Sequence, residues 1–354
     1  MNILINSPSL NPNINVSGIS SVTRFIINNN KVNNYIHFTI GRGDNEHRNI
    51  YWLFNYILSL IKWSDMIASK KIELVHFNFP LSKLAIIRDT FYLIISMLFK
   101  KKMIIHIHGG EYLFSNKRPF VFELLLSIVF KMRIPIITLS DLEKNKIIAD
   151  YNSIFVFSLP NCVEQNNNFI FKKNNKILKI LFIGRITNSK GIYYLLSGLE
   201  ILYNIGIDFK FIVAGKGNKM YEYNYNAKKI LNRKFLYAGV VSGTEKTNLI
   251  KSCDIFILPS IYGEGLPIAL LECMSYGLVP IVTDDGSMST VVKHLVNGII
   301  IRKCSAEDIC YNIKLLNDNR LLLSKLGHEA GQTIYSNFNP VKYISKLNWI
   351  YDQA

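Results

Sequence analysis

The chain has 354 residues, which is long for a single hydrophobic core and suits two domains. Hydrophobic residues make up 49% of it and the mean hydropathy is +0.18, yet no stretch is a clean transmembrane span. The strongest candidate, residues 84–99, contains Arg88 and Asp89, which are costly in hydrocarbon. The five cysteines are scattered without a C-x2-C pair, which argues against zinc ligands or disulfides and favours reduced thiols of a cytoplasmic protein.

The net charge of +16 is spread over both halves of the chain. Residues 1–165 carry 18 Lys and Arg against 11 Asp and Glu, and residues 166–354 carry 23 against 14. A basic balance can indicate nucleic acid, an anionic membrane or an anionic substrate. No zinc finger, basic helix or RNA-binding signature is present, so we expect no nucleic-acid partner.

The first half of the chain alternates predicted strands and helices, which is typical of a parallel α/β sheet. The start lacks the basic region of a signal peptide and predicts a first buried strand over residues 2–7. A loop follows, and Gly18 begins the first long helix. Further strands are predicted over residues 71–77, 103–108, 134–140 and 154–159.

Three helices of this half are rich in apolar and aromatic residues and end in basic ones. They cover residues 51–71, 91–102 and 120–133. Such helices suit the face of an anionic bilayer, and they equally suit the flank of a sheet on which they bury their apolar faces. For most of these helices, taken one by one, packing on the sheet is the favoured interpretation. A membrane surface stays open for the domain as a whole, which would then be peripheral on the inner face of the plasma membrane.

Two histidines mark the end of the strand 103–108. Because a strand alternates, His106 and His108 point to the same face, and Gly109-Gly110 ends the strand where ligands bind in open α/β sheets. A pair of core histidines is the alternative, and it fits His106 better than His108. A two-histidine metal site would need further ligands, and none can be identified.

After a polar linker over residues 165–176, the second half begins with a strand over residues 179–183. Gly184, Arg185 and Lys190 lie in the loop that follows it. Two cations in such a loop can neutralise a diphosphate. The strand over residues 209–214 ends in Gly-Lys-Gly, which is not a G-x-G-x-x-G fingerprint, so no nicotinamide site is expected. Another strand, over residues 235–238, leads into a turn that contains Val240.

The segment 253–283 has the pattern of a strand, a glycine-rich loop, a helix and a second strand. Pro267 suits the first helical position of a helix over residues 267–276, and Gly277 suits its left-handed end. Glycines and a helix N-terminus favour an anion site. Glu264 and Glu272 bracket that site, where they could bind the hydroxyls of a sugar or ribose. Equally, Glu264 could be a solvated loop residue and Glu272 a paired helix residue.

The spacing E-G-L-P-x4-E over residues 264–272 resembles retaining glycosyltransferases of family 4. Their G-R-x4-K-G motif is matched in full over residues 184–191. The resemblance implies an α/β protein with the GT-B fold, in which two Rossmann-like domains face each other across a cleft. Residues 1–165 would form the acceptor-side domain, with the helix 340–354 crossing back to it. Residues 166–339 would form the domain that binds the nucleotide-sugar.

The resemblance also implies roles for residues of this chain. Arg185 and Lys190 would stabilise the departing diphosphate, Glu264 would hold the sugar, and His108 would contact the sugar from the other domain. The further donor-binding residues would be Gly18, Gly184, Val240, Gly265, Leu266, Pro267 and Glu272. Such enzymes do not generally depend on a metal, so no cofactor is expected and the Asp284-Asp285 pair is interpreted as a turn. Family members usually have two adjacent glycines where this chain has Ser17-Gly18, and a glutamate where it has Thr290.

The resulting hypothesis is a retaining hexosyltransferase. It would move a sugar from a UDP- or GDP-sugar to an acceptor hydroxyl, on a lipid-linked glycan of cell-surface polysaccharide synthesis. One alternative is a GT-B epimerase or phosphorylase that uses the same donor site. Another is a basic protein without catalysis that binds membrane or nucleic acid.

Overall fold

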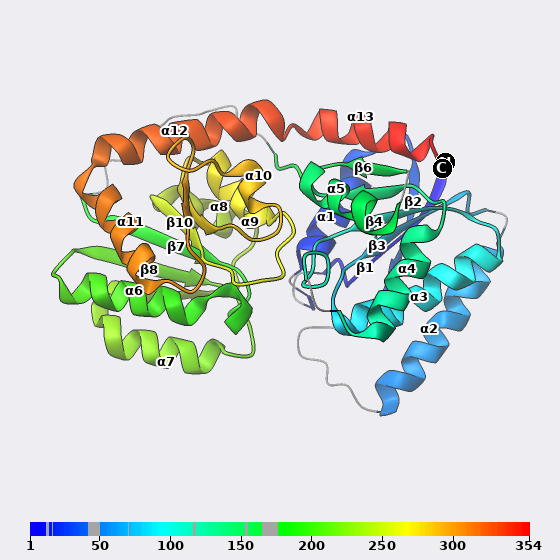
Figure 1. Ribbon diagram of the computed structural model, residues 1–354, viewed down its shortest axis with the longest axis horizontal. Helices are drawn as coiled ribbons and strands as arrows, with labels where there is room; N and C mark the ends of the chain where they lie inside the picture. The colour runs from blue at the N-terminus through cyan, green and yellow to red at the C-terminus, as the bar shows by residue number, and fades with distance from the viewer. Residues whose placement is uncertain are drawn as a thin grey trace. The chain divides into compact units, whose positions relative to one another are not determined.

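The computed structural model describes residues 1–11, 14–15, 17–41, 50–69, 71–115, 118–152, 155–164 and 176–354. These residues form two compact units. The first comprises Met1–Asn161 with Val341–Ala354, and the second comprises Cys162–Pro340. Each unit is a parallel sheet covered by helices, as Figure 1 shows. The predicted linker lies outside the described residues except for Lys176.

The sheet of the first unit has six parallel strands in the order β2-β1-β3-β4-β5-β6. The strands are β1 (Asn2–Ser7), β2 (Asn34–Thr39), β3 (Leu74–Phe79), β4 (Lys102–Ile107), β5 (Ile136–Thr138) and β6 (Val156–Ser158). The helices are α1 (Gly18–Asn29), α2 (Ile50–Ala68), α3 (Lys83–Leu98), α4 (Phe120–Lys131), α5 (Asp141–Tyr151) and α13 (Pro340–Tyr351). The sequence did not predict β2, an edge strand whose residues are nearly all exposed or half-buried.

The main core of this unit lies between the sheet and helices α2 to α5. Trp63 of α2, Phe77 of β3, Tyr92 of α3 and Phe130 of α4 are buried in it. The last helix packs elsewhere: Tyr343 of α13 lies edge-on to Phe25 of α1. Because all six strands are parallel, their carboxyl ends lie at the same edge of the sheet.

The three apolar helices each bury one face on the sheet, as the favoured interpretation predicts, but each also leaves large apolar residues exposed. Trp63 and Ile67 are the buried residues of α2, whereas its other large apolar side chains are largely exposed or only partly buried. Exposed apolar residues also run along α3 and α4. Helices α2 and α4 end two or three residues earlier than predicted, α3 begins eight residues earlier, at Lys83, and Lys102 belongs to β4. Among the described residues, no helix is both long enough and apolar enough to cross a membrane.

The second unit also has six parallel strands, in the order β12-β11-β10-β7-β8-β9. They are β7 (Leu178–Ile183), β8 (Phe209–Ala214), β9 (Phe235–Gly239), β10 (Ile255–Leu258), β11 (Val279–Thr283) and β12 (Ile299–Ile301). The helices are α6 (Ile192–Asn204), α7 (Met220–Leu231), α8 (Gly243–Ser252), α9 (Ile268–Ser275), α10 (Met288–Val291), α11 (Ala306–Asp318) and α12 (Arg320–Asn337). Short 3₁₀ turns cover Asn188–Lys190 and Asn232–Lys234.

The predicted strands of this unit are confirmed to within one or two residues at each end. Pro267 is a correction, because it precedes the helix instead of beginning it. Its ψ of 125° is extended, and helical geometry starts at Ile268. The left-handed end of the helix is confirmed, since Gly277 has a φ of +71°.

Candidate functional site

The strand order of the second unit locates a candidate site between β7 and β10. From β7 the chain proceeds to β8 and β9 on one side, and then returns to β10, β11 and β12 on the other. Loops that follow β7 and β10 therefore leave the sheet in opposite directions. In open α/β sheets, ligands bind at the carboxyl ends of the strands at such a switch point. Both sequence motifs of this unit lie in these two loops.

An ion pair joins the two loops. Lys190, at the end of the 3₁₀ turn after β7, places Nζ 2.5 Å from Oε1 of Glu264, in the loop after β10. The Ser260 hydroxyl donates a hydrogen bond to the same carboxylate oxygen. The Glu264 side chain is only 6% exposed. The interpretation of Glu264 as a solvated loop residue is therefore wrong.

Backbone packing brings the two loops this close together. Gly191 has a φ of +67°, and a Cβ there would lie 2.0 Å from the carbonyl oxygen of Pro259. The Ile261 amide also donates to the Ser189 carbonyl at 2.8 Å. No other residue fits at position 191, because the strand end occupies the space that a side chain needs. This glycine therefore holds Lys190 within reach of Glu264.

A third loop, after β11, supports the glutamate from the other side. Oδ2 of Asp285 accepts a hydrogen bond of 2.9 Å from the Glu264 amide, and its Oδ1 lies 2.6 Å from Nζ of Lys303. A Cβ on Gly286 would lie 2.1 Å from the Glu264 carbonyl oxygen. Asp285 thus has a structural role, which agrees with the interpretation of the Asp-Asp pair as a turn.

Arg185 differs from Lys190, although both lie in the same loop. It follows Gly184 directly after β7, and its side chain is exposed. Within the described residues it makes no ion pair or hydrogen bond, so its guanidinium is available to a ligand. Val240 lies beyond the end of β9 on the same edge of the sheet, and it is also exposed.

The N-terminus of α9 lies at the end of the Glu264 loop. Gly265 and Leu266 precede it, and Leu266 is buried. The Ser287 amide donates to the Gly265 carbonyl at 3.0 Å, which fixes the entry to the helix. Glu272, in the second turn of α9, forms an ion pair with Lys246 of α8. The prediction left a paired helix residue open for Glu272, and in this structure it is paired.

His108 lies at the equivalent edge of the first unit. Its Nε2 lies 2.6 Å from Oδ1 of Asn78, at the end of the neighbouring strand β3. Its ring lies 4.2 Å from that of His106, so the two histidines share a face, as predicted. Burial, with a smaller contribution from His76, lowers the pKa of His108 to about 3, so the imidazole is neutral at physiological pH.

His106 is a core residue, which was the alternative that fitted it better. It is fully buried, and its Nδ1 lies 3.2 Å from Nε2 of His76. Nδ1 of His76 in turn lies 2.7 Å from the hydroxyl of Tyr351, in α13. Within the described residues, no cluster of three or more His, Cys, Asp and Glu side chains has the arrangement of a metal site.

Gly18 is the first residue of α1, on the loop that follows β1. It is exposed, and a Cβ there would meet no atom within 4 Å. The position therefore has no packing requirement for glycine inside its own unit. Residues 12, 13 and 16 of the preceding loop lie outside the described residues.

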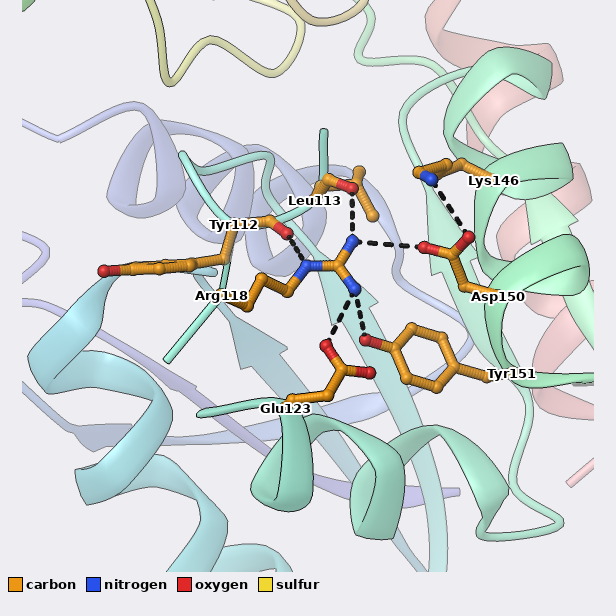
Figure 2. Close-up of polar contacts among 7 residues, drawn as sticks. All are labelled: Tyr112, Leu113, Arg118, Glu123, Lys146, Asp150 and Tyr151. Atoms are coloured by element: carbon orange, nitrogen blue, oxygen red, sulfur yellow. Dashed lines mark hydrogen bonds and ion pairs between the residues drawn. The ribbon is translucent and has the colours of Figure 1, made fainter. Parts of the chain in front are cut away.

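Arg118 anchors the chain after His108, as Figure 2 shows. Its guanidinium donates to the carbonyl oxygens of Tyr112 and Leu113 at 2.6 and 2.9 Å. It also donates to Glu123 of α4 at 3.0 Å, and to Tyr151 and Asp150 of α5 at 2.7 and 3.1 Å. One arginine, whose side chain is 9% exposed, therefore ties the loop at the ligand edge to two helices.

The sequence did not identify the partners that hold these side chains. They are Ser260 and Asp285 beside Glu264, Lys246 beside Glu272, Asn78 beside His108, and Arg118. A signal existed for two of them, because Ser260 directly follows a strand and Asp285 follows another at the same edge. Lys246 and Asn78 lie far along the chain from the residues they contact, and nothing in the local sequence pattern marks Arg118 as an anchor.

The chain is related in sequence to known glycosyltransferases. Residues 163–333 match the family described as Glycosyl transferases group 1. An uncharacterised glycosyltransferase of Methanocaldococcus jannaschii, MJ1069, is 25% identical over 273 residues, which cover 72% of this chain and 69% of that protein. The UDP-Gal:alpha-D-GlcNAc-diphosphoundecaprenol alpha-1,3-galactosyltransferase of Escherichia coli is 27% identical over 184 residues, covering 51% of this chain and 46% of that enzyme.

Among solved structures, Anabaena Alr3699/HepE in complex with UDP-glucose matches with a TM-score of 0.79. The alignment covers 100% of both chains at 12% identity, so the similarity concerns the fold alone. Two six-stranded parallel sheets of this topology, each with its own helices, define the GT-B architecture. Residues 163–333 thus match the group 1 glycosyltransferases in sequence, and the fold of the chain agrees with that match. Its homologues include enzymes of bacterial polysaccharide synthesis.

Proposed function

We propose that this protein is a retaining glycosyltransferase that transfers a hexose from a UDP- or GDP-sugar to a hydroxyl of a lipid-linked glycan. The observation that carries the proposal is the meeting of Lys190 and Glu264 at the switch point of the second sheet. Arg185 lies in the same loop and is unpaired among the described residues. This arrangement offers two cations to a diphosphate and one carboxylate to sugar hydroxyls.

The reaction is a group transfer. The bond between the anomeric carbon and the diphosphate oxygen breaks, and a bond from that carbon to the acceptor oxygen forms. The acceptor proton leaves with the nucleoside diphosphate or passes to solvent. Arg185, Lys190 and the amides at the start of α9 would stabilise the charge that develops on the departing diphosphate. No side chain is assigned as a nucleophile, which suits transfer on the same face and retention of configuration.

The remaining roles follow from charge state and position. Glu264 accepts hydrogen bonds from sugar hydroxyls once Lys190 turns to the diphosphate. Glu272 binds the ribose of the donor in exchange for its contact with Lys246. His108 is neutral, so its contribution toward the transferred sugar is a hydrogen bond and not a charge. We propose no metal requirement, because the two basic side chains and the helix N-terminus supply the positive charge.

The acceptor is proposed from the relatives. The name of the Escherichia coli enzyme states a UDP-galactose donor and a diphosphoundecaprenol-linked acceptor, and a Campylobacter jejuni relative is also named for a diphospho-undecaprenol substrate. The matches cover about half of each of these enzymes or less. Their shared chemistry supports a sugar acceptor carried on a lipid diphosphate.

Calorimetric titration of the purified protein with UDP and with GDP tests the donor site. We expect one nucleotide to bind, and Glu272→Ala to weaken that binding about tenfold, because a ribose hydrogen bond to a carboxylate is lost. Glu245→Ala on α8 is the matched control, since Glu245 is an exposed glutamate near Lys246 with no partner among the described residues. Failure of both nucleotides to bind would overturn the proposal.

Measurement of turnover tests the proposed transfer reaction separately from nucleotide binding. Arg185→Ala should lower kcat about a hundredfold with a smaller effect on nucleotide affinity, because its charge acts on the departing diphosphate. Product analysis by NMR should show the donor's anomeric configuration in the product. Epimerised nucleotide-sugar formed without acceptor, or sugar phosphate formed with inorganic phosphate, would instead identify an epimerase or a phosphorylase.

A further inference from the structure

The first unit carries a second apolar stripe on α2, separate from the one that packs on the sheet. Tyr56, Leu60, Trp63 and Ile67 form the inner stripe at helical spacing. About a third of a turn away, the outer stripe repeats at the same spacing and is exposed. Its residues are Ile50, Leu53, Phe54, Ile57, Leu58 and Ile61, which range from 38% to 72% exposed.

The neighbouring helices extend this stripe into a surface. Helix α3 contacts both α2 and α4, and Figure 1 shows the three helices next to one another on the first unit. The exposed apolar residues of α3 and its end are Leu84, Ile87, Phe91, Met97, Leu98 and Phe99; those of α4 are Phe120, Val121, Leu124 and Ile128. We call the exposed apolar residues of α2, α3 and α4 the outer surface. An apolar surface this extensive marks an interaction site on a soluble protein.

The charged residues around the outer surface indicate which kind of partner binds to it. Residues 50–133 contain twelve Lys and Arg against five Asp and Glu. Lys62, Lys100, Lys131 and Arg133 are exposed on these helices or just beyond their ends. Two of the acidic groups are withdrawn, because Asp89 is buried against Arg88 and Glu123 pairs with Arg118. The surface is therefore apolar with a basic margin.

We propose that the outer surface docks on an anionic lipid bilayer, with the apolar residues among the acyl chains and the basic margin against the phosphates. Helices that combine aromatic and aliphatic residues with lysines lie in this way at a membrane interface. No described helix can span a bilayer, so the contact lies along the surface. A second copy of the chain fits less well, because a two-fold interface would place the basic margin of one copy against that of the other.

This proposal rests on the proposed function and identifies a bilayer as the partner of that enzyme. Its test does not require catalytic activity. The probe is flotation on vesicles of phosphatidylcholine alone, and of phosphatidylcholine with phosphatidylglycerol. We expect flotation with the anionic vesicles, weakened by salt and by Lys100→Gln with Lys131→Gln. Protein that stays at the bottom of the gradient with anionic vesicles would overturn the proposal.

Apolar variants test the surface itself. Phe54→Gln with Ile61→Gln should raise the lipid concentration for half-maximal flotation roughly tenfold, because two apolar side chains lose their burial. Tyr221→Gln with Leu321→Gln, at residues that are even more exposed and lie on the second unit, is the matched control and should float like the wild type. Equal flotation of the Phe54 and Ile61 variant would overturn the proposal.

Two measurements distinguish a bilayer from a second copy of the chain and from a misfolded variant. Nucleotide titration of the Phe54 and Ile61 variant should match the wild type, which shows that it is folded and keeps the proposed donor site apart from the surface. Sedimentation velocity without lipid should show a monomer. A dimer that the same variant converts to a monomer would assign the outer surface to a second copy and overturn the proposal.

Discussion

Nζ of Lys190 and Oε1 of Glu264 lie 2.5 Å apart, although 74 residues separate them in the chain. The pair connects the loops after β7 and β10, and Ser260 donates to the same oxygen. A buried carboxylate is tolerated only when it is paired and hydrogen-bonded. The ion pair therefore stabilises the two loops, and its members are also the groups that the proposed donor would engage.

Removal of one partner should cost more than removal of both. Lys190→Met leaves the buried Glu264 carboxylate with Ser260 and should lower the free energy of unfolding by about 2 kcal/mol. Adding Glu264→Gln should recover part of that loss. Urea unfolding of the two single variants and the double variant measures the coupling. Strictly additive losses would show that the contact contributes nothing to stability.

Gly191 should tolerate no side chain. Gly191→Ala combines a left-handed φ with a Cβ that would lie 2.0 Å from the Pro259 carbonyl oxygen, so we expect a loss of about 3 kcal/mol or more. Gly206→Ala is the matched control, because Gly206 has a φ of +82° with nothing within 4 Å. It should cost only about 1 kcal/mol, which reflects the backbone conformation alone. Thermal unfolding of both variants compares them, and equal losses would mean that the loops can separate.

The sequence predicted the parts of this fold that local pattern controls. Apolar runs located most of the strands, and the loops of the second unit were found because glycine, proline and charge cluster after those runs. The strand β2 was missed, since an edge strand needs no continuous apolar run. Pro267 was misplaced by one position, because the pattern indicates that a helix begins near it without fixing the first residue of helical geometry.

What the sequence could not supply was the identity of contacts between distant segments. Nothing near Glu264 indicates that Lys190 forms an ion pair with it, and nothing near Glu272 indicates Lys246. Periodicity likewise revealed that α2 is apolar without revealing which of its faces is covered. The division of its residues into an inner and an outer stripe depends on the sheet, which forms only when the chain is folded.

Arg118 should not be replaceable by lysine. Its fork donates to the carbonyl oxygens of Tyr112 and Leu113 and to side chains of α4 and α5, and an ammonium group cannot reach them all. We expect Arg118→Lys to lower the free energy of unfolding by about 2 kcal/mol. Arg302→Lys is the matched control. Its ion pair with Asp308 is largely exposed on the arginine side, so the free energy of unfolding should change much less. Comparable losses for the two variants would contradict the anchoring role.

The buried His76 should make the protein sensitive to acid. Burial lowers its pKa from 6.5 to about 3, whereas the unfolded chain keeps the ordinary value. Between these two values the unfolded state binds a proton that the folded state does not, so stability falls as the pH falls. We expect His76 to lower the free energy of unfolding by up to ~1.4 kcal/mol for each pH unit below 6.5. Above that pH it should cause no pH dependence.

Urea unfolding between pH 7.5 and 4.5 measures this contribution against variants. His76→Phe should be less stable at pH 7.5, because Tyr351 loses its partner, but its stability should decline less steeply with acid. Tyr351→Phe removes the same hydrogen bond and leaves the imidazole buried, so it should keep the slope of the wild type. The carboxylates titrate alike in all three proteins and cancel in the comparison. A slope for His76→Phe equal to that of the wild type would mean that His76 acquires its proton without unfolding.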